Sequence, residues 1–582
     1  MAEMLSPTTR ITKVRKGPIA QPGTTTSVAG IEAVTERGPA FTPTLVTSIL
    51  DFEEVFGEQL LNRPEAVDAL AGFFDNHGRR VYVNRVVGAG AQAATRDLLD
   101  AMAPTIRVTA SSVGAWGNDV RVACTRVDNI VTAAKSLAAG EHLAIPVVST
   151  AKLQMGDQIS IQATGGAVRG TVQHLDGNNV VLTSPVTLTT PLVGNENVVL
   201  ETFNVVVFNK HGRIFAPSPF NNLRMSPLAG PRHFAVVINN ASRTPITVEA
   251  LSSTSADARP QTDTEPTALS LGADGAAPTV IDYVGSEGTR TGVWAWDKVN
   301  DVNFISVPGV HDHFSPDDAA KIMKGVEVYC ESRADVQCVF TTPRGADYTA
   351  MQKWVTETGN FVSMYMNVYG PYVYAIDRVL GVSTLKDPTG RVMGAIARTH
   401  QTRNFGKAPA GIVDGQIRGI YGLEFEYREG STEYDTIFPA GINLILNFPG
   451  EGFAIWGDAT LDATHEFGSV SMVTVFNIAQ REIARRTRFV NFEPNDMTTR
   501  SRVTRVISSL FRQWREDGIL QGDTDEDAFF VICDETNNTP LTISQNKLRC
   551  RIGLATQQSS RFLEFTIEQD TRAAESALAA AR

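Results

Sequence analysis

The run from Gly441 to Asp534 constrains the fold more than any other part of this 582-residue chain. It begins GINLILNFPGEGFAIWGDATL, which reads as an apolar strand, a Pro-Gly turn and a second strand ending at Trp456. A long helix, the polar cap VNFEPND, a second amphipathic helix, a Gly turn and the strand AFFVICDE follow. This order of elements predicts a compact α+β unit.

Length and charge set the broad class of the protein. A chain of 582 residues is too long for one core, so we expect three or four domains. No apolar run approaches the roughly 20 residues that cross a bilayer, and the polar N-terminus lacks the apolar segment of a secretion signal. The net charge of −11 argues against a nucleic-acid coat, since such surfaces need a basic excess. We therefore expect neither membrane insertion nor direct nucleic-acid binding.

The remaining sequence divides into β-rich and mixed regions. The first residues are rich in Pro, Gly and Thr and suit an extended arm, and the segment SVAGIEAVTERGPAFTPTLVTSILDFEEVFG predicts a strand, a turn and a capped helix. Residues 136–200 predict three alternating strands with DGNN as the turn between the last two, a small β-barrel or sandwich. From Val293 to about Gly430, strands and helices alternate, which indicates an α/β region.

Three short motifs suggest chemistry, and for each the structural alternative is favoured. Gly88-Ala-Gly-Ala-Gln-Ala93 follows a strand and fits a dinucleotide loop, but no acidic residue stands about 20 positions further on. His311-Asp312-His313 contains metal-ligand types, yet it precedes a helix cap and lacks further ligands. Asp523-x-Asp525-x-Asp527 lacks the glycine of a calcium loop. We therefore expect no catalytic residue, no cofactor and no metal.

The two C-terminal helices are unusually rich in arginine. Nine arginines and only three acids lie between Gln480 and Arg515. In the second helix Val503, Val506, Ile507, Leu510, Phe511 and Trp514 form one apolar stripe, capped by Asn495 or Asp496 and ended at Gly518. The arginines must face elsewhere, either toward carboxylates of another protein or toward solvent. Nucleic-acid binding is a third and weaker interpretation of these arginines.

The chain has five cysteines, an odd number, and they are widely spaced with no C-x-x-C pair. A disulfide framework or a zinc site is therefore disfavoured. The cysteines are Cys124, Cys330, Cys338, Cys533 and Cys550. Cys550 lies in a terminal strand expected to reach another chain. We therefore consider a late intersubunit disulfide through Cys550 with Cys533, Cys330 or Cys338, with inert buried thiols as the alternative.

The amino-acid sequences of several segments resemble those of contractile phage tail sheath proteins. The resemblance rests on the Gly441–Asp534 run, on DPTGRVMGAIARTHQTRNFGKAPAG at 387–411, on TASSVGAWGN at 109–118, and on LGADG and DVNFISVPG. It covers most of the chain except about residues 136–200. Departures occur at His77, where the family has Gly, and at Asp458 and Ala459, where the family's corner reads Ala-Arg.

The resemblance implies an α+β multidomain protein whose inner domain is discontinuous, built from N- and C-terminal segments with outer domains inserted between them. The expected ranges are an arm at 1–26, the halves of the inner domain at 27–105 and 436–547, an outer β-rich domain at 106–292 containing the barrel 136–200, a central α/β domain at 293–435, and C-terminal strands and arm at 548–582. Terminal arms would add strands to neighbouring subunits.

By the same resemblance the protein is a structural subunit, with no enzymatic activity, of a sheath that surrounds an inner tail tube and contracts to drive it through the host envelope. Implied partners are further copies in hexameric rings, the tube protein, and baseplate and terminator proteins. The implied location is the virion tail, assembled in the host cytoplasm. Arg481, Arg485, Arg486 and Arg488 are the candidate contacts to the tube or a neighbouring subunit. The alternatives are a phage-derived injection device or, in a different class, a receptor-binding tail protein.

Overall fold

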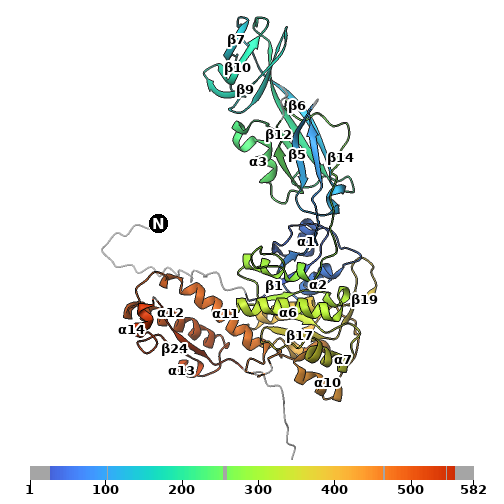
Figure 1. The fold of residues 1–582 in the computed structure, drawn as a ribbon, viewed down its shortest axis with the longest axis vertical. Helices are drawn as coiled ribbons and strands as arrows, with labels where there is room; N and C mark the ends of the chain where they lie inside the picture. Colours follow the sequence, from blue (N-terminus) through green and yellow to red (C-terminus); the bar gives the residue numbers. More distant parts are fainter. Residues whose placement is uncertain are drawn as a thin grey trace, which may run out of the picture.

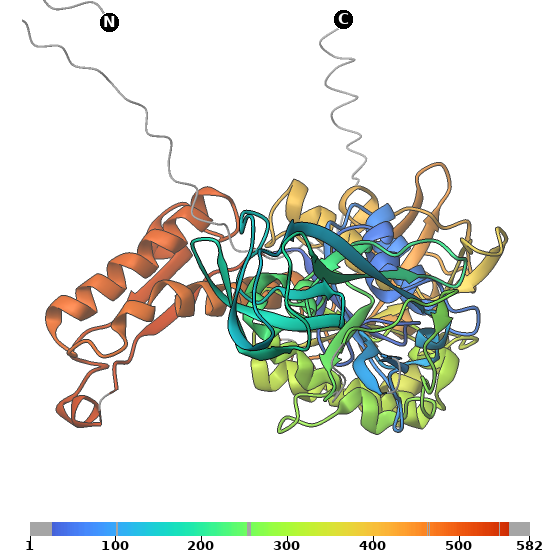
Figure 2. The ribbon, with the colours of Figure 1, turned by 90° about the horizontal axis from the view of Figure 1, so that it is seen from above.

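A computed structural model describes residues 26–100, 103–252, 258–462, 464, 466–545 and 547–557. The predicted N-terminal arm and the end of the C-terminal arm lie almost entirely outside these ranges. Figure 1 shows three parts: a mixed α/β body, a β-rich arm that extends from it along the long axis, and a helical C-terminal lobe beside the body. Seen from above in Figure 2, the lobe projects to one side of the body. The fold is therefore mixed α/β with several separate sheets.

The body is built on one nine-stranded sheet. Its central neighbours pair in parallel, whereas the outer pairs β2–β3, β22–β23 and β23–β20 are antiparallel. In spatial order the strands are β2 (Thr44–Val46), β3 (Arg80–Arg85), β1 (Val28–Ala33), β15 (Phe304–Ser306), β16 (Gln337–Thr341), β17 (Met366–Gly370), β22 (Ile442–Phe448), β23 (Gly452–Trp456) and β20 (Gln416–Ile417). One sheet thus contains strands from the ranges predicted as the two inner halves and the central domain.

Both faces of the body sheet are covered, so its strands read as apolar runs. Along β16, Cys338 and Phe340 belong to one core and Val339 to the other, because successive side chains point to opposite faces. Helix α6 (Pro316–Arg333) packs on the first face, and α1 (Ile49–Phe56), α2 (Glu65–Asp75) and α8 (Thr389–Thr402) pack on the second. Helices α2 and α8 approach closely, since a Cβ at Gly390 would lie 2.2 Å from the Ala69 carbonyl oxygen.

Two long antiparallel strands, β6 (Arg121–Ala133) and β11 (Asn197–Phe208), run the length of the arm. They pass through two successive hydrophobic cores. The core nearer the body also contains β4 (Thr95–Leu99), β5 (Pro104–Ala110), β13 (Ile246–Ala250) and α3 (Phe234–Asn239); β12 (Phe220–Leu223) and β14 (Thr267–Ala268) complete this part. The outer core contains β7 (Gly140–Pro146), β8 (Gln158–Ala163), β9 (Gly166–Asp176) and β10 (Asn179–Leu188). The three strands expected within 136–200 are present, and β7 is an additional one.

The C-terminal lobe has a core of its own. Helix α11 (Val470–Arg486) leaves the body, and α12 (Met497–Glu516) packs against it through the predicted stripe, in which Val506 alone is only partly buried. Asp496 caps α12 by accepting the Thr499 N–H. The lobe is completed by α13 (Asp525–Ala528), β24 (Phe529–Ile532), α14 (Pro540–Ser544) and β25 (Arg551–Leu554).

A small three-stranded sheet lies on the side of the body away from the lobe in Figure 1. Its strands are β19 (Ser383–Lys386), β18 (Val373–Ile376) and β21 (Gly422–Leu423). The remaining short helices are α4 (Val280–Val284), α5 (Val310–His313), α7 (Tyr348–Lys353), α9 (Gly411–Asp414) and α10 (Thr432–Ile437).

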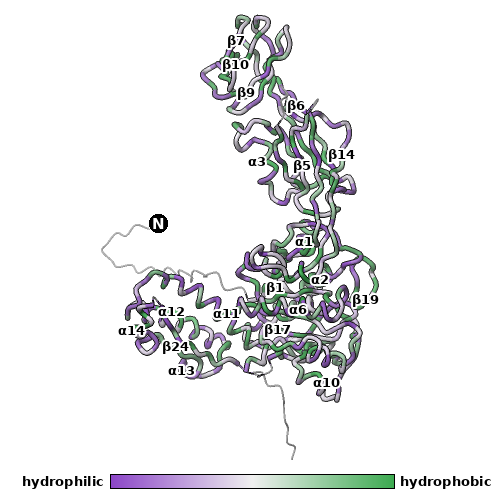
Figure 3. Tube along the Cα trace, viewed as in Figure 1, coloured by the Kyte–Doolittle hydropathy of each residue, from purple (hydrophilic) through white to green (hydrophobic). Residues whose placement is uncertain are grey.

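Among the described residues no helix combines the length and apolarity that a bilayer-spanning segment needs. Figure 3 shows hydrophilic and hydrophobic positions interleaved along α11 and α12, as expected for helices with one buried face.

Candidate assembly surface and polar cavity

Arg481 connects α11 to the body. Its guanidinium Nη2 donates to the carbonyl oxygens of Val302 (2.7 Å) and Asp335 (2.9 Å), and its Nε donates to the Asp335 carboxylate at 3.2 Å. The side chain is only 13% exposed, and burial lowers the pKa of the guanidinium. Arg481 therefore holds the lobe against the body and offers little surface to another molecule.

Arg485 and Arg486 share one buried acid, Glu482, on the preceding turn of α11. Arg485 Nη2 and Arg486 Nε lie 2.6 and 2.9 Å from the same carboxylate oxygen. Burial alone would raise the pKa of Glu482, but the hydrogen bonds from the two arginines outweigh it, so this pKa is lowered. The two arginines remain partly exposed beside a satisfied ion pair.

Arg488 is exposed, and its side chain has no ion-pair or hydrogen-bond partner within the described ranges. On the neighbouring helix Arg502 and Arg505 are also exposed, one turn apart on the same face of α12. Arg502 lies over the ring of Phe489 at 4.1 Å. We refer to Arg488, Arg502 and Arg505 as the basic stripe. Two of its members were not among the predicted contacts, although their i, i+3 spacing opposite the apolar stripe would have indicated them.

Cys533 and Cys550 are joined to each other within one chain, which differs from the intersubunit bridge considered from the sequence. The reason is strand register: β24 and β25 are antiparallel with Ile532 opposite Arg551, so the next residues along, Cys533 and Cys550, also face each other. Their Cα atoms are 4.4 Å apart. Cys124, Cys330 and Cys338 are buried and free.

Strands β24 and β25 form a two-stranded sheet, and within the part of the chain that the structure describes they pair only with each other. Each strand therefore has a second edge that is not paired with another strand of this sheet, although the ends are partly used: the Gln521 N–H donates to the Ala555 carbonyl oxygen and the Asn537 side chain donates to that of Ile532. Such edges are templates for strand addition by another segment.

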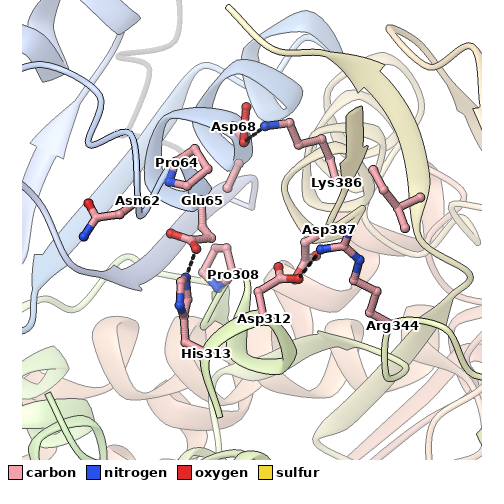
Figure 4. Close-up of a pocket in the computed structure, with 12 residues that line it drawn as sticks. Asn62, Pro64, Glu65, Asp68, Pro308, Asp312, His313, Arg344, Lys386 and Asp387 are labelled. Carbon is pink, nitrogen blue, oxygen red and sulfur yellow. Dashed lines mark hydrogen bonds and ion pairs between the residues drawn. The ribbon is translucent and has the colours of Figure 1, made fainter. Parts of the chain in front are cut away.

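A polar cavity of about 260 Å³ lies in the body between α2, α5 and β19 (Figure 4). The Lys386 ammonium bridges Asp68 and Asp377 at 2.5 and 2.7 Å. Asp387 accepts the backbone N–H groups of Gly309 and Thr389 at 2.8 and 2.7 Å. Burial raises the pKa of Asp387 to about 6. These charged groups are paired with each other or with backbone groups, so the network acts as an anchor for β19 rather than as a free reactive group.

The His311-Asp312-His313 segment does not converge on one point. A ring nitrogen of His311 is 3.1 Å from the Thr341 carbonyl oxygen, and burial lowers the pKa of this histidine to about 4. Asp312 pairs with Arg344 at 3.3 Å, and His313 contacts Glu65. Across the described ranges no group of three or more His, Cys, Asp or Glu side chains is arranged to hold a metal ion.

The Gly88 loop is not a phosphate-binding turn. After this loop the sequence predicts a short helix around Arg96 to Met102, but the structure forms the strand β4 over Thr95–Leu99 instead. The space beside Gly88 is occupied, because a Cβ there would lie 2.0 Å from the Ala276 carbonyl oxygen. At the acidic turn near α13, Asp525 pairs with Arg512 and Arg515 at 2.7 and 3.0 Å. Neither the Gly88 loop nor the Asp523–Asp527 segment forms the phosphate or calcium site that its sequence pattern suggests.

Comparison with known proteins gives contiguous matches over the second half of the chain. Residues 277–461 match the model of the phage tail sheath protein central domain, and residues 462–570 match that of the phage tail sheath C-terminal domain. The tail sheath protein of Vibrio phage KVP40 is 29% identical over 212 residues, which are 36% of this chain and 30% of that protein. The tail sheath protein of Enterobacteria phage T4 is 26% identical over 275 residues, 44% of this chain and 40% of that protein.

The matched region thus spans well under half the length of these curated relatives. Among solved structures, the sheath tail protein Lin1278 from Listeria innocua aligns with a TM-score of 0.52 at 10% identity, covering 88% of this chain and 89% of that one. At this identity the likeness concerns the fold alone.

Proposed function

Because this chain belongs to the phage tail sheath family, we propose that it is a structural subunit of a contractile tail sheath. It polymerises helically around an inner tail tube and contracts to drive the tube through the host envelope for genome delivery, without a catalytic step. The observation that carries this function is the unbroken match of two sheath domain models over residues 277–570. The sheath of a phage-derived injection device would use the same subunit chemistry.

In this proposal the nine-stranded body is the inner part of the sheath, because its sheet combines strands from both halves of the sequence. The β-rich arm then lies outward, and the tip formed by β7 to β10 is available to decorate the outer surface. The lobe lies beside the body, where it can reach the tube or a neighbouring subunit (Figure 2). The mature location is the virion tail, after assembly in the host cytoplasm.

Neighbouring subunits are linked, in this proposal, by strand addition to the β24–β25 sheet. That sheet has two strands, too few for an independently stable sheet of its own. The terminal segments 1–26 and 558–582 of other copies are the strands that we expect to dock there in hexameric rings. Baseplate and terminator proteins would close the ends of the array.

The basic stripe is proposed to contact an acidic surface of the tube or of a neighbouring subunit. Of the four arginines predicted from the sequence as contacts, the basic stripe includes Arg488. It does not include Arg481, whose side chain is buried against Asp335. Arg485 and Arg486 flank the stripe and add to its charge. Arginine suits such a contact because its planar guanidinium binds carboxylates with two hydrogen bonds.

Electron microscopy of the purified protein tests the function directly. We expect hollow striated tubes from the full chain and dispersed particles from a chain lacking residues 1–25. Discrete trimers from the full chain would instead support a receptor-binding tail protein and contradict the sheath function.

Charge reversal tests the basic stripe separately. When the tube protein is supplied, the triple variant Arg488→Glu, Arg502→Glu, Arg505→Glu should reduce the amount of sheath assembled around tubes by tenfold or more. The matched control Arg121→Glu, Arg213→Glu, Arg290→Glu changes the same charge at exposed arginines outside the lobe and should assemble normally. Equal assembly of both variants would contradict a role for the stripe.

A further inference from the structure

The small sheet on the side of the body opposite the lobe exposes an apolar face. Its six large hydrophobic side chains are 41–65% exposed. They lie on β18, in the β18–β19 turn and beside β21, and are Tyr374, Ile376, Val379, Leu380, Val382 and Tyr421. A cluster of this kind on a soluble protein marks an interaction surface. We call it the apolar hairpin face.

The turn that carries this face is held rigidly. The buried Asp377 carboxylate accepts the N–H groups of Val379 and Leu380, both at 2.9 Å, and binds Lys386 at 2.7 Å. Lys386 in turn binds Asp68 of α2 in the polar cavity (Figure 4). The turn that carries Val379, Leu380 and Val382 is therefore fixed to the body. Because this turn is already ordered, less conformational entropy is lost when a partner binds it.

Three more exposed apolar side chains lie on adjoining segments of the lobe. Phe492 is fully exposed, and Met497 and Leu541 are 78% and 68% exposed. The connection between α11 and α12 reaches α14 because Asn495 Nδ2 donates to Asn538 Oδ1 at 3.2 Å and to the Lys547 carbonyl oxygen at 2.9 Å. We call Phe492, Met497 and Leu541 the lobe-tip patch.

We propose that the apolar hairpin face of one copy binds the lobe-tip patch of the next copy. The inference rests on the proposed sheath function and identifies a subunit contact additional to strand addition. Figures 1 and 2 place β19 and α14 on opposite sides of the molecule. Two different patches on opposite sides make a head-to-tail contact, the type that generates rings and helical arrays.

Each patch has a charged residue of opposite sign at its rim. Arg378 stands in the hairpin turn next to Val379 and Leu380; its side chain is 47% exposed and lies 3.9 Å from the half-exposed Asp75 carboxylate, a loose pair that leaves the guanidinium accessible. Glu493 is exposed next to Phe492. An apolar centre with opposite charges at the rim is the common composition of a specific protein interface.

Cysteine crosslinking tests the contact without depending on tube formation. The double variant Leu380→Cys, Phe492→Cys should give a ladder of dimers, trimers and higher oligomers when a concentrated solution is oxidised. Each single variant should give far less ladder. The native free cysteines are buried and Cys533 is paired with Cys550, so they do not compete. A double variant that runs only as monomer would overturn the proposal.

Substitution tests the same contact in assembly. Leu380→Asp and Phe492→Asp should each reduce the number of tubes by tenfold or more while the thermal unfolding midpoint stays within the range of the control Val193→Asp, an exposed valine on the arm. Tubes from wild type and from both aspartate variants would contradict this contact and leave the sheath function intact. Absence of tubes from wild type would count against the sheath function, and the crosslinking result would then decide this contact.

Discussion

Glu32 is an ionisable residue buried at the centre of the body sheet. Its Oε1 accepts hydrogen bonds from Asn84 Nδ2 at 2.8 Å and Trp296 Nε1 at 3.0 Å. Burial raises the pKa of Glu32 from 4.5 to about 8, so the carboxyl group is protonated in the folded protein at neutral pH. The contribution of Glu32 to stability is then fully present below pH 4.5 and is lost as pH rises through about 8.

Replacing Glu32 with Gln should remove this pH dependence. We expect wild type to lose more free energy of unfolding than Glu32→Gln between pH 6 and pH 9, because only wild type must ionise a buried carboxyl group. Denaturant unfolding followed by tryptophan fluorescence at several pH values measures the difference. Glu429→Gln, at an exposed glutamate, is the control and should follow wild type. Parallel curves for wild type and Glu32→Gln would show that burial does not shift this pKa.

Arg481 and Arg485 lie one turn apart and have different environments. Arg481→Met removes three hydrogen bonds and leaves the Val302 and Asp335 carbonyl oxygens without this donor, so we expect a loss of about 2–4 kcal/mol. Arg485→Met should cost about 0–1 kcal/mol, since Arg485 is partly exposed and Arg486 still pairs with Glu482. Chemical denaturation of the two variants measures the contrast, and equal losses would contradict the structural role given to Arg481.

At the scale of elements, two partly exposed sets of ion pairs link the arm to the body. Arg243 near β13 binds Asp51 of α1 at 2.6 Å and also contacts Glu54. Lys210 after β11 lies 2.9 Å from Glu58. A cavity of about 460 Å³ lies at this junction, where Arg37 lies against the rings of Trp116 and Phe215. An imperfectly filled junction held by exposed charges should respond to salt.

The double variant Lys210→Glu, Arg243→Glu should widen the range of arm orientations. We expect small-angle scattering at low salt to show a broader distribution of dimensions for this variant than for wild type. Wild type in about 1 M salt should approach the variant, because the Debye length there is only about 3 Å. Lys135→Glu, Lys152→Glu makes the same charge change at exposed lysines of the arm tip and should behave as wild type. Identical scattering of all samples would mean that the ion pairs do not set the arm's orientation.

At the scale of the whole molecule, the outer tip of the arm is a separable unit. It has its own hydrophobic core and joins the rest of the arm through β6 and β11 and through Asp157, whose carboxylate pairs with Arg224 and Arg232 at 2.8 and 2.6 Å. Asp128 and Glu201 are cross-strand partners, so an Asn-Gly turn can replace residues 129–200 and close a hairpin. The deletion also removes Asp157, the partner of the nearly buried Arg224, so the shortened chain carries Arg224→Met as well. We expect it to retain the far-ultraviolet circular dichroism of the body and to form tubes of smaller outer diameter.

Microscopy and thermal unfolding measure this outcome. The ion pair between the buried Arg259 and the exposed Asp128 lies at the cut and remains in the shortened chain, so the inner core of the arm keeps this contact. Failure of the shortened chain to fold would show that the tip contributes to the stability of the inner core.

Much of the local structure was predictable because short-range patterns determine it. The apolar stripe of α12, its Asp496 cap and the strands β8, β9 and β10 follow from the spacing of apolar and turn residues within a few positions. The amino-acid sequences of the segments around Gly441 and Asp387 indicated the family to which the chain belongs.

The tertiary structure decided which polar residues are available for contact. Arg481 is buried because it meets Asp335, which is 146 positions away, and no local pattern reports such a partner. The same holds for Cys533 and Cys550, which face each other only because β24 and β25 pair in one particular register. The sequence by itself therefore determined most local elements and the family, whereas side-chain exposure and pairing depended on contacts between distant segments, which form only when the whole chain packs.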